Sequence, residues 1–322
     1  MRRPEFISLF VGAVAWPIAA RGQQSSLPVI GFVNGSSATA YAAYVQAFIH
    51  GLAETGYTVG ENVAIEYRWA EGHYDRIPDM VDDLVSRRVA VLAPNTPAAR
   101  AAKHAAGNIP IIFFTGEDPV ASGLVASMNR PGGNATGVTS LFGGLAAKQI
   151  GLLHDLVPAA TLIGFLVNPR NPITEKNVRD ALDAAQKLGE KIEIVHASSE
   201  AEIDAAFEAL RIKRASAVLV QPDAFLINKR IVALAARDGL PAMYQARELV
   251  VAGGLLSYGS SFPDMYRQMG VYARKVLKGV NPAEMPVLQP TKFEMAINLQ
   301  TAKALGLKLS DNLLSLADEV IE

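Results

Sequence analysis

The sequence of 322 residues contains no cysteine. Disulfide bonds, thiol nucleophiles, iron–sulfur clusters and thiolate zinc sites are therefore excluded. A strong charge of either sign is missing as well, because 30 lysines and arginines stand against 31 aspartates and glutamates, a net charge of −1. No block of like charges occurs, so we expect neither nucleic acid nor an anionic membrane surface as a partner.

Long hydrophobic runs and common catalytic motifs are also missing. The apolar run at 6–15 is shorter than the roughly 20 residues that cross a bilayer, and no later segment is long and apolar enough, so we expect no direct membrane insertion. The five histidines share no H-E-x-x-H or H-x-H spacing. Ser257 lacks the G-x-S-x-G surroundings of a hydrolase nucleophile, and the glycines at 31–35 lack a nucleotide-binding spacing. We therefore predict no catalytic residue, no metal and no cofactor.

The N-terminus has the features of an export signal. Arg2 and Arg3 precede the apolar run, and Ala20-Arg21-Gly22 fits the small-x-small pattern of a signal peptidase site. We predict a signal peptide at 1–24, with cleavage before Gln23, and a mature chain outside the cytoplasm. The arginine pair leaves two export routes open, the general secretory route and the twin-arginine route.

What the chain does contain is ample material for a folded core. Half of its residues are hydrophobic and 19% are charged, and its length permits two domains of ordinary size. From residue 28 onward, short apolar strands alternate with amphipathic helices, which indicates a parallel sheet with helices on both faces. The first such unit has predicted strands at 29–33, 63–67, 89–93 and 111–114 and predicted helices at 38–55, 75–87 and 97–106.

The same alternation restarts after a glycine-rich stretch at 130–137. The second unit has predicted strands at 162–167, 192–195, 217–220 and 242–244 and predicted helices at 143–155, 173–188, 200–210 and 228–238. Further strands at 255–258 and 293–299, with a helix at 262–278, indicate that the chain crosses between the lobes more than once. We predict an α/β fold of two doubly wound Rossmann-like lobes joined by a multi-strand hinge, with lobe 1 at 25–139 plus 259–287 and lobe 2 at 140–258 plus 288–322.

Polar and aromatic residues follow the predicted strands at their carboxyl ends. In open doubly wound sheets, ligands bind at these ends, beside helix N-termini with free backbone N–H groups. Hydroxyls, amides, carboxylates and aromatic rings together suit a small polar or zwitterionic solute. The candidate ligand-binding residues are Asn34, Ser36, Ser37, Asn95, Thr96, Thr115, Asp118, Asn168, Asp223, Tyr244, Glu248 and Tyr258.

These candidates divide by chemistry. The hydroxyls and amides suit a solute carboxylate, whereas Asp118, Asp223 or Glu248 would neutralise an ammonium group. Tyr244 and Tyr258 either stack on the ligand or pack between the lobes. The competing interpretation is local, because Asn, Ser, Thr and Asp are also favoured as helix caps.

Several stretches together resemble the ABC-transporter substrate-binding proteins of the ABC_sub_bind family. The resemblance covers nearly the whole chain, and the blocks at 118–125 and 130–138 are specific in combination. The stretches are RRPEFI at 2–7, NVAIEYRWAEG at 62–72, DPVASGLV at 118–125, RPGGNATGV at 130–138, QPTKFE at 289–294 and TAKALGL at 301–307.

The resemblance implies a type I periplasmic binding protein, whose two lobes close on a solute before the protein docks onto an inner-membrane ABC permease. Members of this family include receptors for tryptophan and tyrosine uptake, which favours an amino acid as the solute. Gram-positive members are lipoproteins with a cysteine at the cleavage site, so the absence of cysteine implies a chain free in the periplasm.

We therefore predict a monomeric solute receptor and not an enzyme. Two alternatives stay open at this point. One is a ligand-sensing partner of a membrane signalling protein, and the other is an exported hydrolase-type enzyme with Asp118 or Glu248 as its acid or base.

Overall fold

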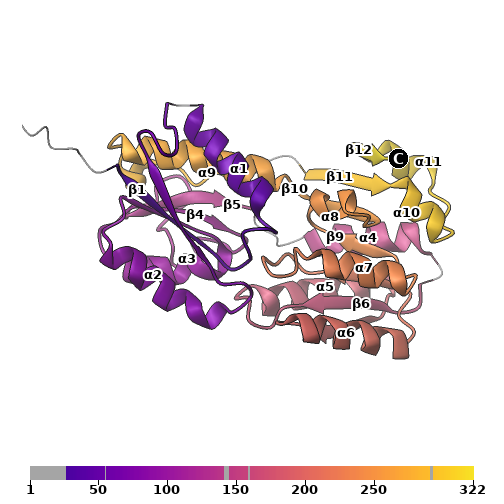
Figure 1. Ribbon diagram of the computed structural model, residues 1–322. Helices are drawn as coiled ribbons and strands as arrows, with labels where there is room; N and C mark the ends of the chain where they lie inside the picture. The colour runs from indigo at the N-terminus through magenta and orange to yellow at the C-terminus, as the bar shows by residue number, and fades with distance from the viewer. Residues whose placement is uncertain (1–26, 55, 141–144, 159, 291–292) are drawn as a thin grey trace, which may run out of the picture.

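A computed structural model describes residues 27–322 except 55, 141–144, 159 and 291–292. The expected signal peptide at 1–24 lies outside the described residues. The chain forms two lobes, each built on one β-sheet, and Figure 1 shows them side by side. The predicted fold class, α/β with two lobes of doubly wound parallel sheet, is confirmed.

The first lobe contains a five-stranded parallel sheet with strand order β2-β1-β3-β4-β5. Four of its strands match the predicted apolar segments to within two residues at each end, and β5 was not predicted. The strands are β1 (Val29–Asn34), β2 (Ala64–Trp69), β3 (Val91–Pro94), β4 (Ile111–Thr115) and β5 (Ala135–Thr139).

Two pairs of helices pack on the sheet of the first lobe. Helices α1 (Ala42–Ala53) and α9 (Phe262–Leu277) pack against each other along the upper side in Figure 1, and α9 also contacts β3, β4 and β5. Helices α2 (Ile77–Ser86) and α3 (Thr96–Ala105) pack together on the lower side, with the short 3-10 helix η1 (Tyr74–Arg76) ahead of α2. A helix from late in the chain therefore completes the lobe that the chain built first.

Glycines bring α1 and α9 into close contact. A Cβ atom on Gly51 would lie 2.0 Å from the carbonyl oxygen of Arg267, and one on Gly270 would lie 2.1 Å from that of Phe48. No carbon atom fits at such distances, so the two backbones meet only because both positions lack a side chain.

The second lobe contains a seven-stranded sheet with strand order β12-β11-β10-β9-β8-β6-β7. Strand β11 runs antiparallel to β10, whereas the other neighbouring strands pair in parallel. The strands are β6 (Ile163–Val167), β7 (Ile192–His196), β8 (Ala217–Val220), β9 (Ala242–Tyr244), β10 (Leu256–Ser260), β11 (Phe293–Asn298) and β12 (Glu319–Ile321).

The helices of the second lobe follow the predicted amphipathic segments, with three short additions. The long ones are α4 (Leu145–Leu156), α5 (Thr174–Leu188), α6 (Glu200–Ile212) and α7 (Lys229–Arg237). Helix α4 packs against α5, and α6 packs against α7. The additions are α8 (Arg247–Val251), α10 (Leu299–Ala304) and α11 (Asp311–Ser315), and a 3-10 helix, η2 (Pro282–Glu284), precedes β11.

Helix α6 begins with a modified form of the Ser-x-x-Glu capping box, at Ser199 and Glu202. Ser199 Oγ accepts a hydrogen bond from Glu202 N at 3.3 Å. The Glu202 carboxylate does not return to Ser199 but accepts from the backbone N–H and the hydroxyl of Ser198, at 2.6 and 2.8 Å. These bonds hold the pKa of Glu202 below its usual range.

The chain passes between the sheets three times: after β5, between β10 and α9, and between α9 and β11. The exact lobe boundaries given above stay a prediction. Among the described residues, no helix combines the length and the apolar character needed to cross a membrane.

Candidate ligand-binding site

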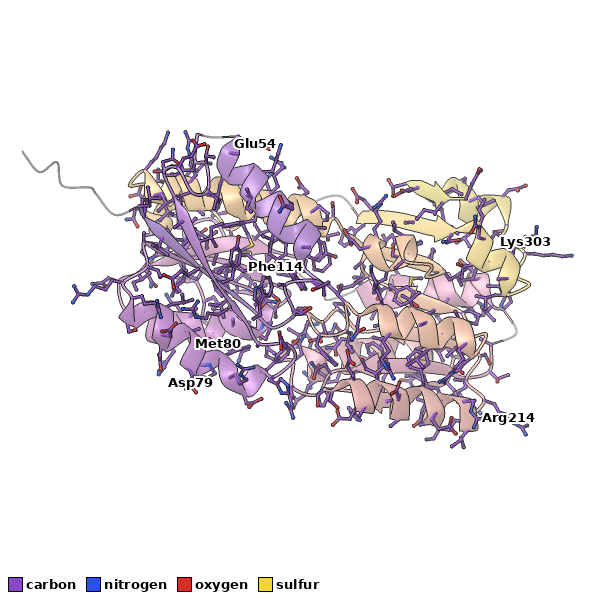
Figure 2. The ribbon with its side chains drawn as sticks, viewed as in Figure 1. Glu54, Asp79, Met80, Phe114, Arg214 and Lys303 are labelled. Carbon is purple, nitrogen blue, oxygen red and sulfur yellow. The ribbon has the colours of Figure 1, made fainter. Side chains whose placement is uncertain are left out.

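The carboxyl ends of the two sheets meet at the junction between the lobes. Residues after β3 and at the end of β4 face residues that follow β6, β8 and β9, which is where open α/β sheets bind ligands. Phe114, labelled in Figure 2, lies on this side of the first lobe. The resulting cavity is lined by Tyr41, Asn95, Thr96, Pro97, Phe114, Asn171, Pro222, Asp223, Ala224, Gln245 and Phe262.

This interlobe cavity is very small. Its volume is about 10 Å³, which holds one water molecule at most. Buried hydrophobic residues continue without a break from the first lobe through Phe262 and Phe225 into the second. The lobes are thus in contact around a site that has room for a solute only if they separate.

Asp223 is the most strongly held polar residue of the cavity. It follows β8, and its side chain is 3% exposed. Its carboxylate accepts five hydrogen bonds, from Tyr74 Oη at 2.8 Å, Asn168 Nδ2 at 3.1 Å, Asn171 Nδ2 at 2.6 Å, Phe225 N at 2.9 Å and Leu226 N at 3.1 Å. Burial raises the pKa of Asp223 above its usual range, and these hydrogen bonds oppose the rise.

The two asparagines that bind Asp223 are themselves fixed. Asn168 Oδ1 accepts from Arg170 N at 3.0 Å, and Asn171 Oδ1 accepts from Ile173 N at 3.1 Å. Each amide therefore turns its oxygen to the local backbone and its nitrogen to the carboxylate. The loop after β6 presents two preset donors to one acid.

Aromatic rings form the apolar side of the cavity. Tyr41 precedes α1, Phe114 is the second-last residue of β4 and Phe262 begins α9. The rings of Phe114 and Phe262 have centroids 5.5 Å apart, and Tyr41 meets Tyr44 edge-on at 4.9 Å. Burial raises the pKa of Tyr41 well above its usual range, so its hydroxyl stays neutral near neutral pH.

Two of the candidates on the first lobe line the cavity. Asn95 Oδ1 accepts from Gly35 N at 3.1 Å, and Thr96 Oγ1 accepts from Gly116 N at 3.1 Å. Each side chain thereby ties its strand end to a neighbouring loop. The hydrogen of the Thr96 hydroxyl is still available for donation to a ligand.

Four other candidates on the first lobe do not line the cavity. Asn34 Oδ1 accepts from Ser36 N at 2.8 Å, Ser37 Oγ accepts from Ala40 N at 3.2 Å, and Thr115 Oγ1 accepts from Glu117 N at 3.0 Å. Local turn formation accounts for the side chains of Asn34, Ser37 and Thr115. Ser36 and Ser37 line a separate groove of about 530 Å³ with residues from both lobes.

Asp118 and the two tyrosines also lie outside the cavity. Asp118 is exposed, and its Oδ1 accepts from Val120 N and Ala121 N at 2.9 and 3.2 Å. Tyr244 is buried in the second lobe, beside a different small cavity. Tyr258 stacks on Phe293 with ring centroids 5.8 Å apart, next to a chain crossing. The structure therefore places Tyr258 as a packing residue near the hinge.

Polar contacts between described residues bridge the lobes. Tyr44 Oη donates to Glu248 Oε2 at 2.7 Å, and Tyr74 Oη donates to Asp223 and accepts from Phe225 N at 3.3 Å. A further contact, between Arg170 and Asp75, is an exposed pair at 3.5 Å and contributes little. Glu248, a candidate from the sequence, thus contacts the other lobe and not the interlobe cavity.

Several cavity residues were not among the sequence candidates. Tyr41 and Phe262 belong to helix segments whose apolar pattern predicts core packing. Gln245 directly follows the candidate Tyr244, the last residue of β9, and of the two only Gln245 lines the cavity. The sequence feature that could have identified Gln245 and Asn171 as cavity residues is their position in the loops that follow β9 and β6.

A search of protein families matches residues 26–321 to the family described as ABC transporter substrate binding protein. The chain is also 29% identical over 273 residues to a tyrosine-binding protein of Clostridioides difficile, covering 83% of this chain and 78% of that one.

Two solved structures have closely similar folds. A Streptococcus pneumoniae ABC domain in complex with L-Trp is 27% identical with a TM-score of 0.81, and a conserved domain protein of Vibrio cholerae is 23% identical with a TM-score of 0.83. Each comparison covers 92% of this chain and 100% of the other. A third, the ligand-free, open structure of a Clostridium difficile substrate-binding protein, is 23% identical with a TM-score of 0.60, covering 92% and 99% of the two chains.

Proposed function

Because the chain belongs to the family of ABC transporter substrate-binding proteins, we propose that it is an exported receptor for an aromatic amino acid, which it delivers to an ABC permease. Proteins of this family bind small solutes and are not enzymes, which confirms that part of the sequence prediction. The names of two relatives support the solute class, since one binds tyrosine and another was solved with L-Trp. Export to the periplasm and a monomeric state are part of the proposal.

The observation that carries the proposal is the environment of Asp223. All five of its hydrogen-bond donors are neutral: a phenol, two amides and two backbone N–H groups. A buried carboxylate with neutral donors is strongly stabilised when a cation joins it. The ammonium group of an amino acid supplies that cation, and the rings of Tyr41, Phe114 and Phe262 supply a surface for an aromatic side chain.

Closure of the lobes follows as the binding step. The cavity residues come from both lobes, so a solute held between Asp223 and Thr96 stabilises the closed arrangement over the open one. The TM-score of 0.81 with the L-Trp complex, against 0.60 with the open, ligand-free relative, supports a closed arrangement here. A sensor protein in place of the permease would read the same closure.

Calorimetric titration of residues 23–322 tests the proposal. We expect L-Trp, L-Tyr or L-Phe to bind, and tryptamine and indole-3-propionate, which lack the carboxylate or the ammonium group, to bind far more weakly. Asp223→Asn should weaken binding by about 100-fold, roughly 3 kcal/mol, because it removes a buried charge partner.

Asp118→Asn is the matched control. It makes the same change at an exposed acid outside the cavity, so affinity should stay within twofold of wild type. If Asp223→Asn binds the amino acids as tightly as wild type does, or if none of these amino acids binds the wild type after unfolding and refolding to remove bound solute, the proposal fails.

A further inference from the structure

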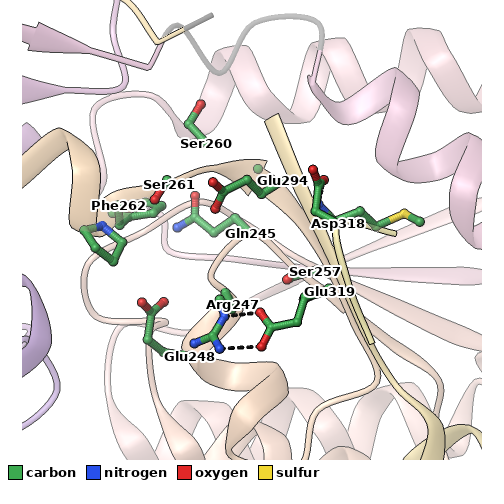
Figure 3. Close-up of a pocket in the computed structure, with 14 residues that line it drawn as sticks. Gln245, Arg247, Glu248, Ser257, Ser260, Ser261, Phe262, Glu294, Asp318 and Glu319 are labelled. Carbon is green, nitrogen blue, oxygen red and sulfur yellow. Dashed lines mark hydrogen bonds and ion pairs between the residues drawn. The ribbon is translucent and has the colours of Figure 1, made fainter. Parts of the chain in front are cut away.

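Gln245 lies where the interlobe cavity adjoins a larger groove. It directly follows β9, and the residue is 6% exposed. The groove, drawn in Figure 3, has a volume of about 370 Å³ and lies beside the chain crossing between β10 and α9. Gln245 and Phe262 both line the cavity as well as the groove. A solute that fills the interlobe cavity therefore lies beside Gln245.

The amide oxygen of Gln245 is buried and has no hydrogen-bond donor within the described part of the chain. This sets it apart from the amide oxygens of Asn95 and Asn171, which both accept a hydrogen bond from a backbone N–H group. A buried oxygen normally has a partner, and a solute that displaces water from a site must replace the hydrogen bonds that the water made. Gln245 Oε1 therefore marks a position for a hydrogen-bond donor on the solute.

Gln245 belongs to the aromatic side of the cavity. In Figure 3 its side chain extends toward Ser261 and Phe262. The ring centroids of Phe262 and Phe114 are 5.5 Å apart, and both rings line the cavity. An aromatic solute that packs on these rings brings the edge of its own ring toward Gln245. We expect the amide to meet the ring of the solute and not its ammonium or carboxylate group.

Asp223 and Gln245 differ in charge, and this difference sorts the donors of the solute. An ionised carboxylate forms the stronger, charge-assisted hydrogen bonds, so Asp223 suits the ammonium group. The neutral amide oxygen of Gln245 is left for a neutral donor. The indole N–H of tryptophan and the phenol O–H of tyrosine are such donors, whereas the phenyl ring of phenylalanine has none.

We propose that Gln245 is a specificity-determining residue, whose Oε1 accepts a hydrogen bond from the ring N–H or O–H of the bound solute. This inference rests on the proposed function and narrows its solute class to aromatic amino acids with a donor on the ring. A site that hydrogen-bonds such a group discriminates against the analogue that lacks it, because the buried acceptor is then left unpaired. L-Phe is therefore the poorer ligand.

Calorimetry with ring-matched pairs of solutes tests this inference. L-Tyr and L-Phe differ only in the phenol O–H, and in 3-benzothienyl-L-alanine a sulfur atom replaces the indole N–H of L-Trp. We expect the wild type to bind the donor-bearing member of at least one pair tighter than its analogue, by about tenfold or more. Gln245→Met has a side chain of similar length without the amide. It should abolish the preference by weakening the donor-bearing solute alone, while the affinity for the analogue stays within about threefold.

Gln186→Met is the matched control, because it makes the same change at an exposed glutamine of α5 outside the cavity. It should keep the wild-type preference. Melting curves establish that the variants fold, and Gln245→Leu serves if Gln245→Met does not.

Two results would overturn the inference while the proposed function stands. In one, the wild type binds both members of each pair equally well. In the other, Gln245→Met weakens both members of a pair alike, which would assign the amide to the amino-acid end of the solute or to packing. If the wild type binds none of the aromatic amino acids, the proposed function fails and this inference fails with it.

Discussion

Asp223 combines two opposing influences in one side chain. Five hydrogen bonds favour its ionised form, whereas burial favours the neutral form and raises its pKa above the usual range. Burial has the larger effect on the pKa. In the absence of solute, the ionised form of Asp223 is therefore destabilised in the folded protein, and a bound ammonium group would offset this destabilisation. The behaviour of the site with pH follows from this balance.

We expect Asp223 to make the solute-free protein less stable as the pH rises. The pKa of Asp223 in the folded protein is above its unfolded value of about 3.9. Its contribution to the free energy of unfolding is therefore fully present below the unfolded pKa and is lost as the pH rises through the folded pKa. Urea unfolding from pH 4 to 8 should therefore show wild type losing free energy of unfolding relative to Asp223→Asn. Parallel pH profiles for the two proteins would contradict this expectation.

At the scale of single residues, sequence reasoning located part of the cavity. Asn95, Thr96 and Asp223 follow buried strands, and that position alone placed them correctly at the sheet edge. It did not decide between cap and cavity, because Asp118 occupies an equivalent position and turns its carboxylate to its own loop. That choice depends on side-chain direction, which is set by packing that no sequence pattern records.

Helices α1 and α9 depend on their glycine contact. Gly270→Ala would place Cβ 2.1 Å from the carbonyl oxygen of Phe48, so the helices must move apart. We expect a loss of about 2–3 kcal/mol, because overpacking against backbone cannot be relieved by a rotamer change. The melting temperature should fall by roughly 4–10 °C in calorimetric scans.

Gly151→Ala in α4 is the control for this substitution. Gly151 also lies inside a helix, but nothing lies within 4 Å of its Cβ position. Alanine there should raise stability by about 0.5–1 kcal/mol through helix propensity alone. Equal effects of the two substitutions would show that the α1–α9 contact is not constrained by its glycines.

At the scale of elements, the sequence predicted the regular strands and helices well and missed the atypical ones. Strand β5 lies in a segment whose glycines and asparagine indicate a turn. Yet a Cβ on Gly137 would lie 2.0 Å from Phe113 O, so this glycine permits close strand pairing. Strand β12 has three residues, too few for any periodic pattern to appear.

Gly72 of the first lobe lies against the second lobe, so it would limit the proposed lobe closure. It has φ +84°, and a Cβ there would lie 2.6 Å from the Phe225 ring of the second lobe. We expect Gly72→Ala to oppose closure and weaken solute binding at least tenfold, which corresponds to about 1.4 kcal/mol. X-ray scattering should show a larger radius of gyration for this variant in the presence of solute.

Gly60→Ala controls for backbone strain. Gly60 has φ +90° with nothing within 4 Å of its Cβ position, so alanine carries a similar conformational cost without touching the other lobe. Both variants should lose a similar amount of stability, of the order of 1 kcal/mol, while only Gly72→Ala loses affinity. Equal affinity losses would mean that Gly72 does not limit closure.

The two-lobe architecture as a whole was predictable from the alternation of strands and helices. The contacts between the lobes were not, because Tyr44–Glu248 and Tyr74–Asp223 join residues 204 and 149 positions apart. No local pattern relates such distant positions. They become neighbours only after both sheets have formed and the chain has crossed between them.

The small interlobe cavity has a further consequence for transport. A receptor that closes without cargo would present a permease with the same outline as a loaded one, and the transporter would then hydrolyse ATP for nothing. In the proposed receptor, the buried Asp223 carboxyl group, whose pKa burial raises, penalises that empty shape. Closure without solute would then be rarer than closure around a solute.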